Sequence, residues 1–190
     1  MGRGTVNPRF PADLLIAALL VFAWCATAQA TGIVVERGET RLEDGVFVLD
    51  ADVDYELGAD PSEALDNGVP LVLELEIEVR RVPDWILREP VATLRQRYRF
   101  KFHSLTQRYL VTNLNSGDRQ SFRSRGLALD YIGQVRNVPI LDASLIDSRQ
   151  EHSVRVRAGL DIESLPPPLL LLAYVSTSWR LNSEWRSWPL

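Results

Sequence analysis

The fold of this chain is decided by two neighbouring stretches, Val69–Val82 (VPLVLELEIEVRRV) and Val91–His103 (VATLRQRYRFKFH), in which apolar and charged residues alternate. The first stretch carries aliphatic side chains at its odd-numbered positions, which are Leu71, Leu73, Leu75, Ile77 and Val79. Its even-numbered positions carry charges at Glu74, Glu76, Glu78 and Arg80. Successive side chains of a strand point to opposite faces, so this alternation predicts half-buried strands of an antiparallel sheet.

The charges of the two stretches complement each other. A hairpin centred near Ile86 and Leu87 places three carboxylates opposite three arginines, in the pairs Glu78–Arg95, Glu76–Arg97 and Glu74–Arg99. Opposite charges that face each other across an antiparallel pair contribute roughly 0.2–1 kcal/mol each. We therefore interpret the basic region from Arg80 to Arg125 as the partner of an acidic strand. This interpretation competes with binding to nucleic acid or anionic lipid, and with a net charge of −4 we expect no nucleic-acid partner.

The rest of the chain is also rich in strands. Further strands are predicted at Ile33–Arg37, Val46–Leu57, Gln107–Leu114, Arg119–Arg123, Ser153–Ile162 and Ser178–Arg186. Two short helices are predicted, one from Asp60 and Pro61 to a stop at Gly68, and one over Gly126–Val135. Ile140–Ile146 and Leu169–Val175 are ambiguous between strand and helix. We expect a mainly β fold, an antiparallel β-sandwich that is immunoglobulin-like in general architecture, with one or two short helices.

The amino terminus has the three-part pattern of a secretory signal peptide. Arg3 and Arg9 precede the uncharged apolar run Leu14–Ala28, and Ala28 and Ala30 occupy the small-residue positions of a cleavage site. We expect a signal-peptide helix over residues 1–30, a single β-rich domain over residues 31–190, and a periplasmic location. The alternative is an uncleaved inner-membrane anchor, which would be the protein's one contact with the membrane.

Removal of residues 1–30 changes the composition. The single cysteine, Cys25, belongs to the leader, so the exported form has no thiol for disulfides, catalysis or metal binding. Of the charged residues, 19 basic and 24 acidic ones remain, for a net charge of −5. They are unevenly spread, because residues 31–78 hold 14 acidic and two basic residues while residues 79–190 hold 10 acidic and 17 basic ones.

No pattern of residues indicates a catalytic centre. His103 and His152 are each followed by a serine, but adjacent residues of a strand point to opposite faces. There is no nucleophile elbow, phosphate-binding loop or zinc-ligand spacing. We therefore expect a protein that is not an enzyme and has no cofactor or metal. Two alternatives stay open: a small-ligand or cation site, between the sheets or at the acidic stripe Asp50, Asp52 and Asp54, and an enzyme of unrecognised type.

Three tryptophans lie close to the carboxyl terminus. Trp179 and Trp185 share a face of the strand predicted at Ser178–Arg186, and we expect both in the core. Trp188 stands beside Pro189 and is a candidate interaction patch.

Taken together, these stretches resemble a Gram-negative bacterial family of exported proteins catalogued as domain of unknown function 4390. The resemblance covers nearly all of residues 31–190. It rests on Glu63-Ala64-Leu65, Gly68-Val69-Pro70-Leu71, Leu105-Thr106 with Tyr109 and Val111, Phe122 with Ala128-Leu129, Val156-Arg157 with Leu160-Asp161, Leu165-Pro166, and the Trp179, Leu181, Ser183, Trp185 and Trp188 pattern. It implies an exported protein whose gene often lies beside a membrane sensor kinase, and it supplies no catalytic residue. We expect a non-catalytic binding or accessory module of the cell envelope, with an envelope protein as its partner.

Overall fold

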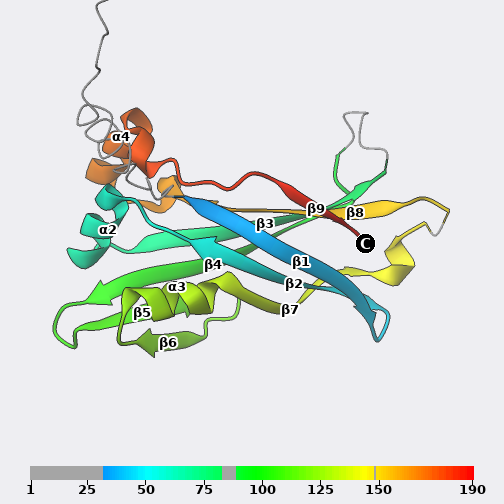
Figure 1. The fold of residues 1–190 in the computed structure, drawn as a ribbon, viewed down its shortest axis with the longest axis horizontal. Helices are drawn as coiled ribbons and strands as arrows, with labels where there is room; N and C mark the ends of the chain where they lie inside the picture. Colours follow the sequence, from blue (N-terminus) through cyan, green and yellow to red (C-terminus); the bar gives the residue numbers. More distant parts are fainter. Residues whose placement is uncertain (1–31, 83–88, 148) are drawn as a thin grey trace, which may run out of the picture. The chain divides into compact units, whose positions relative to one another are not determined.

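The structure is a computed structural model that describes residues 32–82, 89–147 and 149–190. Contacts between residues group positions 31–190 into one compact unit. The described residues are mainly β, with two antiparallel sheets and three α-helices (Figure 1). The prediction of a mainly β, antiparallel fold is therefore confirmed.

The smaller sheet has three strands in the order β1-β2-β7. These are β1 (Ile33–Glu43), β2 (Val46–Tyr55) and β7 (Gln134–Asp142). β1 and β2 form a hairpin, and Asp44 and Gly45 at its turn both have positive φ, 49° and 81°. A two-residue turn with both φ angles positive matches the twist of the flanking strands, which explains why the hairpin turns at these two residues.

The larger sheet has six strands in the order β6-β5-β4-β3-β8-β9, and every neighbouring pair is antiparallel. These are β3 (Leu71–Arg81), β4 (Ala92–His103), β5 (Arg108–Asn113), β6 (Arg119–Phe122), β8 (His152–Leu160) and β9 (Arg186–Pro189). The two decisive stretches are thus β3 and β4, and β3 lies between β4 and β8.

The register of the β3–β4 hairpin differs from the predicted one by two residues. Glu74 lies opposite Arg97 and Glu76 opposite Arg95, whereas Glu78 lies opposite Thr93. An even shift leaves every side chain on its predicted face, because the side-chain period of a strand is two. The structure therefore confirms that acidic residues of β3 face basic residues of β4, but each of the three predicted pairs was wrong.

Three helices connect the strands. α2 (Ala59–Asp66) begins after Gly58 and ends at Asn67, followed by Gly68 with a φ of 82°, the left-handed position that glycine favours. α3 (Arg125–Gly133) begins at Ser124, whose hydroxyl accepts a hydrogen bond from the Leu127 N–H. α4 (Pro167–Val175) shows that the ambiguous run Leu169–Val175 is helical. The other ambiguous run finishes β7 and continues into the 3-10 helix η1 (Ala143–Leu145).

The two sheets share one hydrophobic core. β1 of the smaller sheet contacts β8 and β9 of the larger one (Figure 1). The aliphatic face of β3 is fully buried, with Leu71, Leu73, Leu75, Ile77 and Val79 exposed by 1% or less. Burial of a side chain of this size stabilises the folded state by about 1.5–3 kcal/mol.

The predicted strand Ser178–Arg186 was wrong. The chain instead turns through the 3-10 helix η3 (Thr177–Trp179), touches β8 at one isolated bridge between Asn182 and Gly159, and forms β9 only from Arg186 onward. The turn breaks the alternation, so Trp179 and Trp185 do not share a face. Trp179 is buried in the core as expected.

Candidate interaction surface

Helix α4 leaves a row of apolar side chains exposed. The triple proline Pro166–Pro168 places prolines in the first turn, where a missing N–H costs no helical hydrogen bond, and four leucines follow. Only Ala173 of this helix is buried. Leu171, Leu172, Tyr174 and Val175 are exposed by 71%, 56%, 51% and 81%. Large exposed apolar patches are uncommon on monomeric soluble proteins, so these four residues form a candidate interaction surface. We call these four residues the α4 face.

A groove runs beside the α4 face, between α4 and α2. Its volume is about 370 Å³. Ala64, Val69, Leu169, Leu172, Val175 and Trp179 supply its apolar lining. Two exposed carboxylates, Asp60 and Glu63, also line it and belong to α2. The Asp60 carboxylate accepts a hydrogen bond from the Ser178 hydroxyl, which ties α2 to η3.

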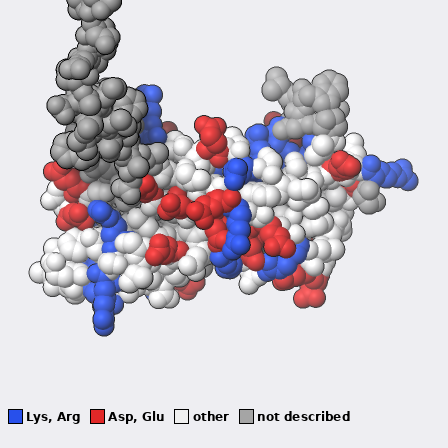
Figure 2. Space-filling view, viewed as in Figure 1, with Lys and Arg blue, Asp and Glu red and all other residues white. Residues whose placement is uncertain are grey.

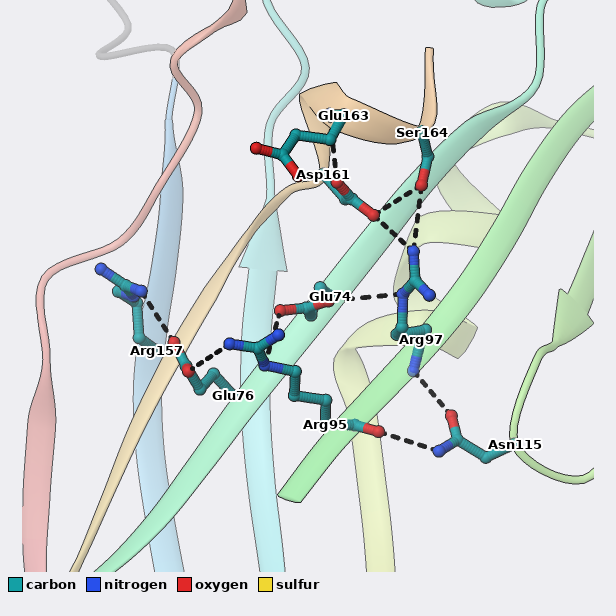
Figure 3. A network of polar contacts seen from close by, with 9 residues as sticks. All are labelled: Glu74, Glu76, Arg95, Arg97, Asn115, Arg157, Asp161, Glu163 and Ser164. Atoms are coloured by element: carbon teal, nitrogen blue, oxygen red, sulfur yellow. Dashed lines mark hydrogen bonds and ion pairs between the residues drawn. The ribbon is translucent and has the colours of Figure 1, made fainter. Parts of the chain in front are cut away.

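The opposite face of β3 carries a network of carboxylates and arginines (Figure 3). Glu76 accepts a hydrogen bond from Arg95 of β4 at 3.2 Å and another from Arg157 of β8 at 2.7 Å. Glu74 forms ion pairs with Arg95 at 3.5 Å and Arg97 at 3.3 Å. The alternation of β8 places its arginines beside β3, but a non-local strand order decides this pairing, so the sequence analysis missed them.

Burial raises the pKa of both glutamates of this network, but the neighbouring arginines outweigh that effect at only one of them. Burial raises the pKa of Glu74 above its ordinary value, and the neighbouring arginines do not fully offset that effect. Burial also tends to raise the pKa of Glu76, but the hydrogen bonds from Arg157 and Arg95 outweigh it and lower the pKa below its ordinary value. The fold therefore favours the charge on Glu76 and disfavours the charge on Glu74.

Trp185 lies on this polar face and is half-buried, so the expectation that it belongs to the core was wrong. The guanidinium groups of Arg155 and Arg157 lie 4.4 Å and 4.8 Å from the centre of its ring. Arginines attract the negative face of an indole ring, which explains why this tryptophan packs on charged residues.

The acidic stripe of β2 is also engaged by arginines. Asp50 bonds to Arg41 and to the Asn137 N–H, while Asp52 bonds to Arg37 and Arg136. Figure 2 shows acidic and basic side chains gathered over the β1–β2 hairpin. The hydrogen bond from Arg136 is the main cause of the lowered pKa of Asp52. Asp54, the third residue of the stripe, is exposed. Within the described ranges, no three or more His, Cys, Asp or Glu side chains are grouped so that they could hold a metal ion. The arginine contacts of Asp50 and Asp52 do not favour the cation-site alternative.

The two histidines lie at opposite ends of the larger sheet. His152 begins β8 opposite Arg81, the last residue of β3, whereas His103 ends β4 beyond the start of β3. A ring nitrogen of His103 bonds to the Thr106 hydroxyl at 3.1 Å, and one of His152 bonds to the Gln150 carbonyl at 2.9 Å. The structure therefore does not bring the two rings together.

Trp188, the residue proposed as an interaction patch, is half-buried in β9 opposite Val154. It packs against the hydrophobic core. Its ring lies directly over Gly38 of β1, where a Cβ atom would stand 2.7 Å from the ring. Two further contacts join these edge strands: the Thr40 hydroxyl donates to the Pro189 carbonyl, and Arg186 donates to the Glu36 carbonyl.

The proposed cleavage-site residues Ala28 and Ala30 lie outside the described residues. Among the helices that are described, none has both the length and the apolar character that a membrane span requires.

The exposed residues of α4 were not identified from the sequence. The signal that could have found them is the proline start followed by a leucine run without a polar face.

The chain matches a model of a known protein family. No curated protein and no solved structure matches the chain. The family model described as "Domain of unknown function (DUF4390)" matches residues 30–189, which is most of the chain and includes every described strand and helix. The chain therefore belongs to this family of domains of unknown function.

Proposed function

We propose that this protein is a non-catalytic binding or accessory module of the bacterial cell envelope, exported to the periplasm, which holds a protein partner on its α4 face. The exposed leucines of α4 carry this proposal. A domain that buries the entire aliphatic face of β3 leaves Leu171 and Val175 exposed by 71% and 81% on a helix with no polar face. Burial of apolar surface stabilises a complex by about 25 cal/mol per Å², so a partner that covers this helix forms a complex that this burial stabilises.

The remaining parts of the proposal rest on the sequence. The leader pattern that ends at Ala28 and Ala30 supports export, and an uncleaved leader would instead anchor the protein in the inner membrane. The two sheets around one core support a β-sandwich, immunoglobulin-like in general architecture. A membrane sensor kinase is the partner that the family resemblance suggests.

Site-specific crosslinking in living cells tests the proposal. A photo-crosslinking amino acid is placed at Leu171 on α4, and the matched control carries it at Gln120, which is exposed on β6. We expect a discrete adduct with an envelope protein from position 171 and no such adduct from position 120. The absence of a discrete adduct at position 171, or the same adduct from both positions, contradicts the proposal.

Fractionation of the same cells tests the location. We expect the mature protein in the periplasm with an amino terminus at Thr31. Recovery with the inner membrane and with residues 1–30 still attached would support the anchored alternative.

A further inference from the structure

We propose that the groove between α2 and α4 binds a basic amphipathic helix of the protein partner. This inference rests on the proposed function and names the chemistry of the partner. The groove has an apolar lining that includes Ala64, Val69 and Trp179, and both α2 and α4 contribute residues to it. An amphipathic helix binds such a groove by inserting apolar side chains spaced three or four residues apart along one face.

The charge around the groove indicates which charge the partner helix carries. Residues 59–69 and 161–179, which supply the groove and its surroundings, contain five acidic residues and no basic one. Two of the five are already paired, because Asp66 forms an ion pair with Arg125 and Asp161 forms one with Arg97.

The carboxylates that line the groove are not neutralised in this way. In the part of the chain that the structure describes, no ion pair joins Asp60 or Glu63 to a basic side chain. The basic residue that follows this segment is Arg180, and its guanidinium donates to the Tyr174 carbonyl at the end of α4, 3.2 Å away. A partner that carries lysine or arginine beside its apolar face supplies the missing charge.

The same carboxylates disfavour two other occupants of the α4 face. A second copy of this chain in a two-fold dimer would place the same patch against itself, so Asp60 and Glu63 of both copies would approach each other. An anionic membrane surface would repel them as well, since membrane-binding helices carry lysine or arginine on their polar face. A basic amphipathic helix would cover the apolar surface and pair with the two carboxylates.

Peptide binding to residues 31–190, the compact unit with its own core, tests this inference. The probes are two fluorescein-labelled helices of about 15 residues with leucine on one face. One has lysine at the remaining positions and the other has glutamate. Fluorescence anisotropy is recorded at about 20 mM and about 0.5 M salt, because salt screens surface charge pairs.

We expect the lysine peptide to bind at least about tenfold more tightly than the glutamate peptide at low salt, which corresponds to about 1.4 kcal/mol. The double variant Asp60→Asn, Glu63→Gln should lose most of this preference. The matched control Glu39→Gln, Asp44→Asn removes the same charge from the β1–β2 hairpin and should keep it. Leu172→Ser should weaken binding of the lysine peptide, and circular dichroism confirms that each variant is folded.

Three results would overturn the inference: equal affinity for both peptides, equal loss in the test and control variants, or binding to anionic vesicles in preference to the lysine peptide. If one of these results is obtained together with a discrete adduct from position 171, the proposed function stands and only the inference of a basic partner helix is rejected. The lack of an adduct at position 171 contradicts the proposed function itself.

Discussion

Replacement of Glu76 by glutamine should destabilise the protein more than the same replacement of Glu74, although the two residues are neighbours on one face of β3. The side chain of Glu76 is 12% exposed and accepts hydrogen bonds from Arg95 and Arg157. The side chain of Glu74 is 22% exposed and forms ion pairs at 3.3 Å and 3.5 Å. The two variants therefore compare a carboxylate whose charge the fold favours with one whose charge it disfavours.

The expected magnitude follows from the exposure of the partners. A hydrogen bond to a charged group contributes about 1.5–3 kcal/mol when buried. Arg95 and Arg157 are 59% and 42% exposed, so solvent screens both contacts toward the range of surface pairs, about 0.2–1 kcal/mol. Two such contacts give a loss of about 0.4–2 kcal/mol for Glu76→Gln, which lowers Tm by about 1–8 °C in a domain of this size. We expect Glu74→Gln to cost less than about 0.5 kcal/mol.

The effect of Glu76 should depend on pH. Its folded-state pKa is lowered, so its charge contributes stability above the unfolded-state pKa, about 4.3, and this contribution is lost as the pH falls through the folded-state pKa. The pKa of Glu74 is raised, so its charged form lowers stability at neutral pH. The gap between the parent and Glu76→Gln should therefore narrow below about pH 4.

Urea unfolding followed by circular dichroism, at about pH 7 and about pH 3.5, measures these free energies. Either of two results would refute the reasoning. One is a Glu74→Gln variant that loses as much stability as Glu76→Gln at neutral pH. The other is a gap between the parent and Glu76→Gln that stays unchanged at the lower pH.

Three further predictions concern packing and charge. Gly133→Ala would place a Cβ atom 2.0 Å from the Val53 carbonyl oxygen, so we expect urea unfolding to show a loss of more than about 2 kcal/mol, and an unchanged midpoint would contradict the packing of α3 on β2. Gly38→Ala should displace the Trp188 ring and cost about 1–3 kcal/mol, with a shift in tryptophan fluorescence that is absent if the ring does not lie over this glycine. Arg99→Thr should change stability by less than about 0.5 kcal/mol, because Arg99 is exposed and forms no ion pair among the described residues; a larger loss would reveal a partner.

The faces of the strands followed from the sequence, whereas the strand neighbours did not. A period of two fixes which side of β3 is buried, and the structure confirms that side for Leu73 and Glu76 alike. The placement of β8 beside β3 depends on residues about 80 positions apart, which local periodicity does not report. For this reason Arg157 and the ring of Trp185 were missed as parts of the polar face.

The candidate site followed from the sequence only in part. A run of four leucines with no polar face has no period, so Leu169–Val175 favoured neither strand nor helix. The prolines before this run favour the start of a helix, and the surrounding fold leaves Leu171 exposed to solvent. Trp188 was predicted as an interaction patch because it is aromatic and near the carboxyl terminus, but in the structure its ring fills the space over Gly38.

The charge pattern of β3 and β4 has a consequence for how the chain folds. Because acidic and basic residues repeat every two positions, a hairpin displaced by two residues still pairs three glutamates with three arginines and uses Arg99, which the native register leaves without an ion pair among the described residues. The native register is therefore selected on the buried face, where Phe100 lies opposite Leu71 and both are fully enclosed. A hairpin in the displaced register would have its charges paired and its core misaligned, so we expect its formation to slow folding. Because such a hairpin must open before the native register forms, Arg99→Thr, which removes one charge pair from the displaced register alone, should speed refolding while leaving the unfolding rate unchanged.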